Sequence, residues 1–202
     1  MQKELIYMSN HIDFYFDIIS PYSYIAHKKI QKIQETNKIK FNYKPILLGG
    51  LHNLAGITAP AFNKYKIKIL KSDCELVSIK NKIDFTWNIK FPINSLYLMR
   101  GYLYVQEDQK KNYLEIFFNA YWKDNLDLSI NKNIIKLLNN LNIDSKKFFN
   151  GIKNQSIKDN LKNLTNEAFK KEVFGAPTFI VKDKIFWGQD RLEYAIDEFN
   201  LN

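Results

Sequence analysis

The stretch FYFDIISPYSYIA, residues 14–26, decides the fold because a strand pattern runs directly into a helix start. The aromatic-rich segment His11 to Phe16 predicts a short strand. Ser20 is suited to be the N-cap of the following helix, and Pro21 to be its first residue, because the serine oxygen accepts an unpaired amide and proline has none to lose. The helix itself is indicated by apolar residues at helical spacing: Tyr24, Ile25, Ile30 and Ile33.

Outward from this stretch, the chain predicts a second strand and then a long run of helices. The strand is Ile39 to Ile46. From Leu51 to about Gln155 the expected elements are helical: Lys64 to Lys80, Ser95 to Tyr104, Lys110 to Trp122, Asn131 to Leu141, and a turn near Phe148 and Phe149. The last part predicts a helix, two strands and a final helix: Ser156 to Phe174, Phe179 to Val181, Ile185 to Trp187, and Arg191 to Phe199.

This order, βαβ, helices, then αββα, is typical of an α/β protein with a thioredoxin-like fold and an all-helical insertion. We expect one domain over residues 1–202. Its thioredoxin-like part covers about 10–50 and 156–202, and its helical insertion about 51–155.

The net charge of +9 raises the question of nucleic-acid binding. Arg100 and Arg191 are the only arginines, and the lysines are spread along the chain. Because arginine is the side chain suited to bidentate phosphate and base contacts, we interpret the charge as a solvated surface without a nucleic-acid partner. No apolar run is long enough to span a membrane, and Met1 to Glu4 do not resemble a signal peptide. We therefore expect a cytoplasmic protein.

The cysteine and histidine content excludes several chemistries. Cys74 is the single cysteine, which rules out an intramolecular disulfide and a dithiol motif. It shares a helix face with Leu70 and Val77, so we interpret it as a small core residue. The three histidines are not spaced as metal ligands, and we expect no metal site.

Five segments in order give the chain a resemblance to a known family. These are FYFDIISPYSYIA (14–26), KPILLGG (44–50), FPINSLYLMRG (91–101), GAPTF (175–179) and WGQDRLE (187–193). Together they resemble the 2-hydroxychromene-2-carboxylate isomerases and the kappa-class glutathione transferases, over about residues 12–199. The resemblance implies a thioredoxin domain interrupted by a helical domain, as in DsbA-like proteins, with glutathione as cofactor.

Ser20 and Ser23 stand where disulfide oxidoreductases of this fold carry Cys-x-x-Cys. A hydroxyl cannot replace a thiolate in disulfide exchange, but at a helix N-terminus it favours a bound anion. The resemblance implies that this anion is the glutathione thiolate and that Ser20 is the catalytic residue. The local sequence alone favours an ordinary N-cap at Ser20, and the resemblance favours the catalytic role. Asp17 either orients the site or caps the turn at the strand end.

The resemblance also implies the remaining glutathione contacts. Ala176 and Pro177 would offer backbone groups beside a cis-proline, and Gln189 with Asp190 would bind the γ-glutamyl end. Lys66 would lie near glutathione. Each position has a plain alternative: a trans proline ending a helix, an exposed lysine, and a capping box in residues 190–193. Ile57 occupies the position where kappa enzymes carry an asparagine, so a polar contact is lost there.

The leading hypothesis is a glutathione-dependent isomerase acting on a small-molecule substrate, an aromatic or unsaturated carboxylic acid. The resemblance implies that the thiolate adds to an unsaturated carbon, a bond rotates and the thiolate leaves. It also implies a homodimer. The alternatives are a kappa-like glutathione transferase or peroxidase, and a non-catalytic binding protein that has kept the thioredoxin fold.

Overall fold

A mixed sheet forms the centre of the protein, whose computed structural model describes residues 11–36 and 39–201. The strand order is β2–β1–β3–β4. β1 (Ile12–Phe16) pairs in parallel with β2 (Phe41–Pro45) and antiparallel with β3 (Thr178–Val181), which pairs antiparallel with β4 (Lys184–Trp187). The four expected strands are therefore present. Met1 to Glu4, on which the expectation about a signal peptide rests, lie outside the described residues.

The helices follow the expected order. Their bounds are α1 (Pro21–Thr36), α2 (Leu48–Ala55), α3 (Lys64–Lys80), α4 (Leu96–Tyr104), α5 (Lys110–Trp122), α6 (Asn131–Asn140), α7 (Ser145–Gly151), α8 (Gln155–Lys170) and α9 (Leu192–Asn200). Short 3-10 turns occur at Pro60–Phe62, Glu107–Gln109 and Gln189–Arg191. The α3 and α5 bounds agree with the sequence prediction, whereas α2 was not among the expected helices.

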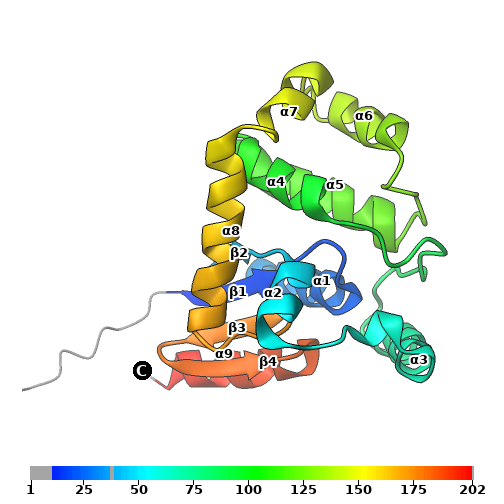
Figure 1. Ribbon diagram of the computed structural model, residues 1–202. Coiled ribbons are helices and arrows are strands. Elements are labelled where there is room, and N and C mark those ends of the chain that lie inside the picture. Colours follow the sequence, from blue (N-terminus) through cyan, green and yellow to red (C-terminus); the bar gives the residue numbers. More distant parts are fainter. Residues whose placement is uncertain (1–10, 37–38, 202) are drawn as a thin grey trace, which may run out of the picture.

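The helices from α4 to α7 build a layer beside the sheet (Figure 1). α4 and α5 lie together next to the strands, α6 and α7 lie farther out, and α8 runs from that outer end back along the sheet. This arrangement agrees with the fold class expected from the sequence. The division into one domain with boundaries near residues 51 and 155 stays a prediction.

Aromatic side chains join the sheet to the helical layer. Phe14 and Phe16 share one face of β1 because side chains alternate along a strand, and both are fully buried. The Phe16 ring meets Tyr102 of α4 edge-on, with centroids 5.2 Å apart, and Phe118 of α5 at 6.3 Å. Burial of each such ring stabilises the fold by about 1.5–3 kcal/mol. The sheet and the helical layer therefore share one core.

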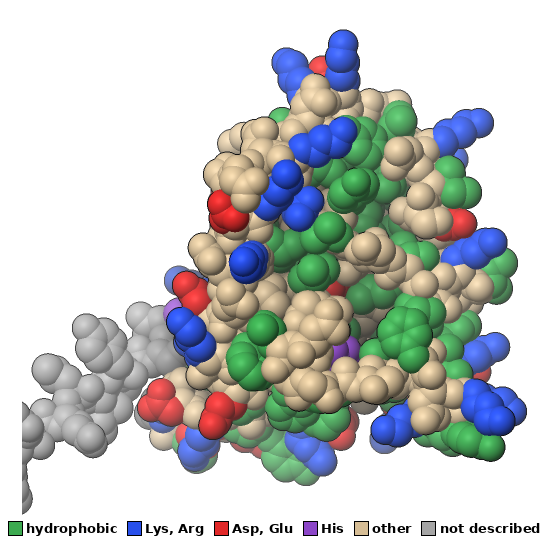
Figure 2. Space-filling model, in the orientation of Figure 1, with side chains coloured by type: hydrophobic (Ala, Val, Ile, Leu, Met, Phe, Trp, Pro, Cys, Tyr) green, Lys and Arg blue, Asp and Glu red, His purple; other side chains and the backbone are tan. Residues whose placement is uncertain are grey.

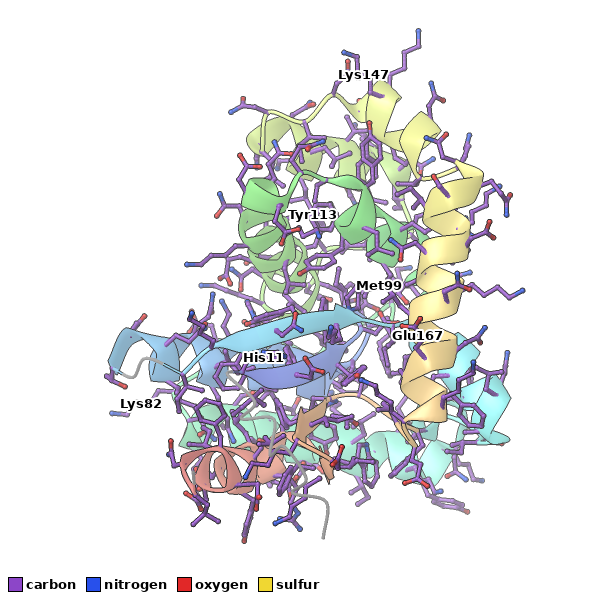
Figure 3. The ribbon with its side chains drawn as sticks, turned by 90° about the vertical axis from the view of Figure 1, so that its left-hand side faces the viewer. His11, Lys82, Met99, Tyr113, Lys147 and Glu167 are labelled. Atoms are coloured by element: carbon purple, nitrogen blue, oxygen red, sulfur yellow. The ribbon has the colours of Figure 1, made fainter. Side chains whose placement is uncertain are left out.

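Two contacts from this layer fix the chain that follows β1. Trp122 Nε1 donates to the Ile18 carbonyl oxygen at 2.8 Å, and the Ile18 amide donates to Met99 Sδ at 3.4 Å. Figure 3 shows Met99 between the helical layer and the strands, with Tyr113 deeper among the helices. The segment between β1 and α1, which carries Ser20, is therefore positioned by helices far away in sequence.

No helix among residues 11–36 and 39–201 is long and apolar enough to cross a membrane. On the face that Figure 2 shows, basic side chains are spread over the surface with acidic ones among them. This distribution agrees with the interpretation of the positive charge as a solvated surface.

Candidate active site

Ser20 lies at the start of α1 with its side chain almost fully buried (3% exposed). Its Oγ accepts a hydrogen bond from the Ser23 amide at 3.1 Å, which is the N-cap contact that the sequence predicts. The same Oγ donates to the Ala176 carbonyl oxygen at 2.8 Å. The hydroxyl therefore connects the helix N-terminus to the loop before β3.

The peptide bond between Ala176 and Pro177 is cis, as the resemblance implies. The Pro177 carbonyl oxygen accepts a hydrogen bond from the Gly188 amide at 2.9 Å. Gly188 has a φ of 113°, a left-handed conformation that side-chain-bearing residues rarely adopt. This turn brings Gln189 and Asp190 next to the proline loop, so the structure assembles five of the six predicted site residues.

Gln189 and Asp190 differ in their surroundings. Gln189 is buried, and its Oε1 accepts a hydrogen bond from Lys29 Nζ at 2.6 Å. Burial lowers the pKa of Lys29. The Asp190 side chain is exposed, with Oδ2 3.3 Å from Arg191 Nη1.

The predicted capping box at residues 190–193 is wrong. A 3-10 turn, Gln189–Arg191, comes first, and α9 begins at Leu192 without a side-chain cap. A backbone hydrogen bond closes this turn instead, because the Arg191 amide donates to the Gly188 carbonyl oxygen at 3.1 Å. The Asp190 carboxylate is therefore not used as a helix cap.

A second carboxylate approaches from α3. Tyr22 Oη donates to Asp73 Oδ2 at 2.5 Å. The pKa of Tyr22 is raised, first by burial, then by this hydrogen bond and by nearby negative charges that include Asp190. Asp73 and Asp190 thus both lie close enough to influence the same hydroxyl. Two carboxylates therefore lie on this side of α1, and a carboxylate suits a ligand ammonium group.

Asp17 caps the turn at the strand end, which is one of the two roles that the sequence left open, and it also contacts α2 and α4. Its Oδ1 accepts from the Ile19 amide at 3.0 Å, which caps the turn after β1. Its Oδ2 accepts from the Leu48 amide at 2.8 Å and from Ser95 Oγ at 2.9 Å. The carboxyl is fully buried, and burial raises its pKa to about 6 although all three hydrogen bonds act in the other direction. Asp17 therefore ties the Ser20 loop to the beginnings of α2 and α4.

Lys66 is the predicted site residue that the structure does not bring to Ser20. It lies exposed in the first turn of α3, where its backbone amide donates to Asn63 Oδ1 at 3.1 Å. Ile57, just after α2, is 38% exposed. Cys74 is fully buried and burial raises its pKa, so its thiol is inert in this fold.

The assembled groups suit the binding of a small zwitterionic thiol. A helix N-terminus with a hydroxyl favours a thiolate, a cis-proline loop presents backbone groups, and carboxylates favour an ammonium. Within the described part of the chain no group of three or more His, Cys, Asp and Glu residues could hold a metal ion.

Sequence reasoning missed Lys29, Asp73 and Ser95. Tyr22 and Lys29 are seven residues apart in α1 and therefore lie on one helix face, a spacing that indicates a shared environment. Asp73 and Ser95 carry no such signal, because their contacts with the α1 region span 51 and 78 residues.

The comparison with known families agrees with this fold. The family model of the DSBA-like thioredoxin domain matches residues 11–199, and the chain belongs to this family.

Individual relatives are similar over nearly the whole chain. The 2-hydroxychromene-2-carboxylate isomerase of Sphingobium xenophagum is 26% identical over 189 residues, 93% of this chain and 96% of that protein. Glutathione S-transferase kappa 1 of Rattus norvegicus is 22% identical over 197 residues, 90% of this chain and 87% of that protein. A solved structure of a 2-hydroxychromene-2-carboxylate isomerase superposes with a TM-score of 0.85 at 25% identity, over 94% of both chains.

Proposed function

We propose that this protein is a glutathione-dependent isomerase acting on an aromatic or unsaturated carboxylic acid, with Ser20 as its catalytic residue. The observation that carries the proposal is the position of the Ser20 hydroxyl, at the N-terminus of α1 and 2.8 Å from the cis-proline loop. The curated relatives are isomerases and glutathione transferases, which supports an enzyme that uses glutathione. Bound glutathione would supply the thiolate that adds to an unsaturated carbon.

Ser20 and the helix terminus together would lower the pKa of a bound thiol. The helix terminus contributes about 0.3–2 kcal/mol, and a hydrogen bond to a charged group about 1.5–3 kcal/mol. Their sum corresponds to roughly 1–4 pKa units at 1.36 kcal/mol for each unit. A thiol that titrates near 8.5 in water would then titrate between about 4.5 and 7.5, so that thiolate is populated at neutral pH.

This role requires a change of partner at Ser20. A serine hydroxyl has one proton to donate, and in this structure that proton goes to the Ala176 carbonyl oxygen. Donation to a sulfur therefore requires the O–H to turn away from the carbonyl. The Ser23 amide, which donates to the same Oγ, holds the oxygen in place while its proton changes direction. The Ala176 carbonyl oxygen would then be free to accept a hydrogen bond from an amide of the ligand.

The other end of glutathione would bind at Asp190 and Gln189. The exposed Asp190 carboxylate is suited to the γ-glutamyl ammonium, and the nearby Asp73 adds negative charge. Lys66 stays a candidate for a glutathione carboxylate only if its long side chain turns toward the site, because the structure gives its ammonium no partner near Ser20. Ile57 offers an apolar contact where kappa enzymes carry an asparagine.

A kappa-like glutathione transferase is the second candidate, and it is favoured by the similarity to the rat enzyme over 90% of this chain. Both candidates require glutathione. Isomerisation of 2-hydroxychromene-2-carboxylate with glutathione neither consumed nor conjugated identifies the isomerase, and a stable glutathione conjugate identifies the transferase.

Glutathione binding itself is tested by thermal unfolding. At one hundred times the dissociation constant, glutathione should stabilise the protein by about 2.7 kcal/mol, and oxidised glutathione should stabilise it less. No change at millimolar glutathione would overturn the proposal. The expected homodimer is tested by light scattering on the same sample, and the cytoplasmic location by cell fractionation.

A further inference from the structure

A cavity of about 420 Å³ lies between α2, α4 and α8. Ser20, Pro177 and Asp190 are not among its lining residues, so it does not contain the groups of the site described above. Its volume falls in the range of about 300–1,000 Å³ that is usual for small-molecule sites. In the view of Figure 2, hydrophobic and basic side chains lie next to one another where these three helices meet.

One side of the cavity is apolar. Leu47 and Leu54 contribute from the α2 region, Leu96 from the start of α4, and Leu161 from α8. Leu161 is buried, whereas Leu54 at the end of α2 is 45% exposed. Thr165, the nearby hydroxyl, already accepts from the Leu47 amide and donates to the Leu161 carbonyl. The leucine side therefore offers a ligand hydrophobic contact and no free hydroxyl proton.

The other side of the cavity carries an excess of positive charge. Arg100, Lys158 and Lys162 line it together with one carboxylate, Asp159. Asp159 accepts from Gln155 Nε2 at 2.8 Å. Within the described residues, none of the three cations forms a hydrogen bond or an ion pair with a carboxylate through its side chain.

The three cations lie close to one another around the cavity. Lys158 and Lys162 are four residues apart on α8, so their ammonium groups lie on the same helix face and repel each other. Arg100 faces them across the cavity, and its Nε is buried without any hydrogen-bond partner in the described part of the chain. Buried donors are nearly always paired in folded proteins, and an unpaired one indicates a missing ligand or solvent contact.

We propose that this cavity binds a small organic acid, with its carboxylate between Arg100, Lys158 and Lys162 and its apolar body against the leucines. A planar guanidinium is suited to a carboxylate, and two further cations raise the local anion concentration. A fully polar anion such as phosphate would leave the leucine side without contact. The proposal goes beyond the proposed function, and its test needs no glutathione.

The experiment titrates the full chain with 4-phenylbutyrate, and with the neutral 4-phenylbutyramide as the matched ligand. Binding is followed by calorimetry and by the NMR signals of the arginine Nε–H groups. Arg100 and Arg191 are the only arginines, so the spectrum contains one reporter in the cavity and one outside it. We expect one saturable site with a dissociation constant on the order of 1 mM or tighter, and a shift of the Arg100 signal alone.

Two double variants, each of which removes two positive charges, test where the acid binds. Lys158→Gln with Lys162→Gln should weaken binding by about tenfold or more. Lys146→Gln with Lys147→Gln, exposed on α7 and outside the cavity, should leave it unchanged. The proposal is overturned by the absence of saturable binding, by equal affinity for the amide, by a shift confined to Arg191, or by equal effects of the two double variants.

Discussion

The Ser20 hydroxyl donates a hydrogen bond to the Ala176 carbonyl oxygen, 2.8 Å away and 156 residues further along the chain. The contact joins the N-terminus of α1 to the residue before the cis-proline, and it leaves Ser20 only 3% exposed. A sulfur that enters the site therefore competes with a carbonyl for a single proton. How Ser20 changes partner is the central question that the structure raises about this protein.

Asp17 should give the free energy of unfolding a distinct pH dependence. Its pKa is about 6 in the folded protein and about 3.9 in an unfolded chain, so between these values the folded protein binds more protons. The stabilisation is complete below about pH 4, is lost as the pH rises to about 6, and stays constant above that. The difference of about two units corresponds to roughly 3 kcal/mol.

Asp17→Asn should remove this dependence. Urea unfolding at several pH values compares the variant with wild type, and Asp183→Asn, in the exposed turn between β3 and β4, is the control. If wild type and Asp17→Asn keep the same pH dependence, Asp17 does not titrate in this range.

Asp190→Asn should weaken glutathione binding by roughly 10- to 150-fold, the equivalent of about 1.5–3 kcal/mol for a lost charge-assisted contact. Cysteinylglycine, which lacks the γ-glutamyl group, should bind wild type and variant equally. Calorimetry with both ligands measures the difference. Equal losses for the two ligands would assign Asp190 a structural role in the turn after Gly188.

Cys74 should take no part in activity. It is fully buried, so a thiol reagent should modify it only after unfolding, and Cys74→Ala should keep the wild-type rate. Wild type should also fail to reduce insulin disulfides, because serine occupies both positions of the redox motif at Ser20 and Ser23. Insulin reduction that persists in Cys74→Ala would contradict this interpretation of the motif.

The sequence predicted the parts of the fold that local patterns determine. Ser20 and Pro21 begin α1 as expected, and the periodic segments α3 and α5 have the predicted bounds. α2 was missed because Leu48–Ala55 contains two glycines and is short. Its first amide is held by Asp17, 31 residues earlier, which no local pattern can show.

In the candidate site, too, contacts between residues far apart in sequence could not be predicted. The resemblance supplied Ser20, Ala176, Pro177, Gln189 and Asp190, and the hydrogen bonds of the proline loop bring their backbones together. Asp73 and Ser95 were not predicted because they reach the α1 region only through tertiary packing. The capping box was wrong because a positive φ at Gly188 leads into a 3-10 turn rather than into an α-helix.

The most direct test of Ser20 is a pH titration of the bound glutathione thiolate by its ultraviolet absorbance, together with the isomerase rate. Ser20→Ala removes the hydroxyl at a stability cost of about 1 kcal/mol, which a domain with about 5–15 kcal/mol of stability survives. Ser23→Ala is the matched control, because the buried Ser23 Oγ has no hydrogen-bond partner in the described part of the chain.

We expect Ser20→Ala to keep most of the glutathione affinity, to raise the pKa of the bound thiol by about 1–2 units, and to lower the rate on the order of one hundred-fold. Ser23→Ala should change neither the pKa nor the rate. If Ser20→Ala leaves the thiolate titration and the rate at their wild-type values, Ser20 is a helix cap and the proposed mechanism is wrong.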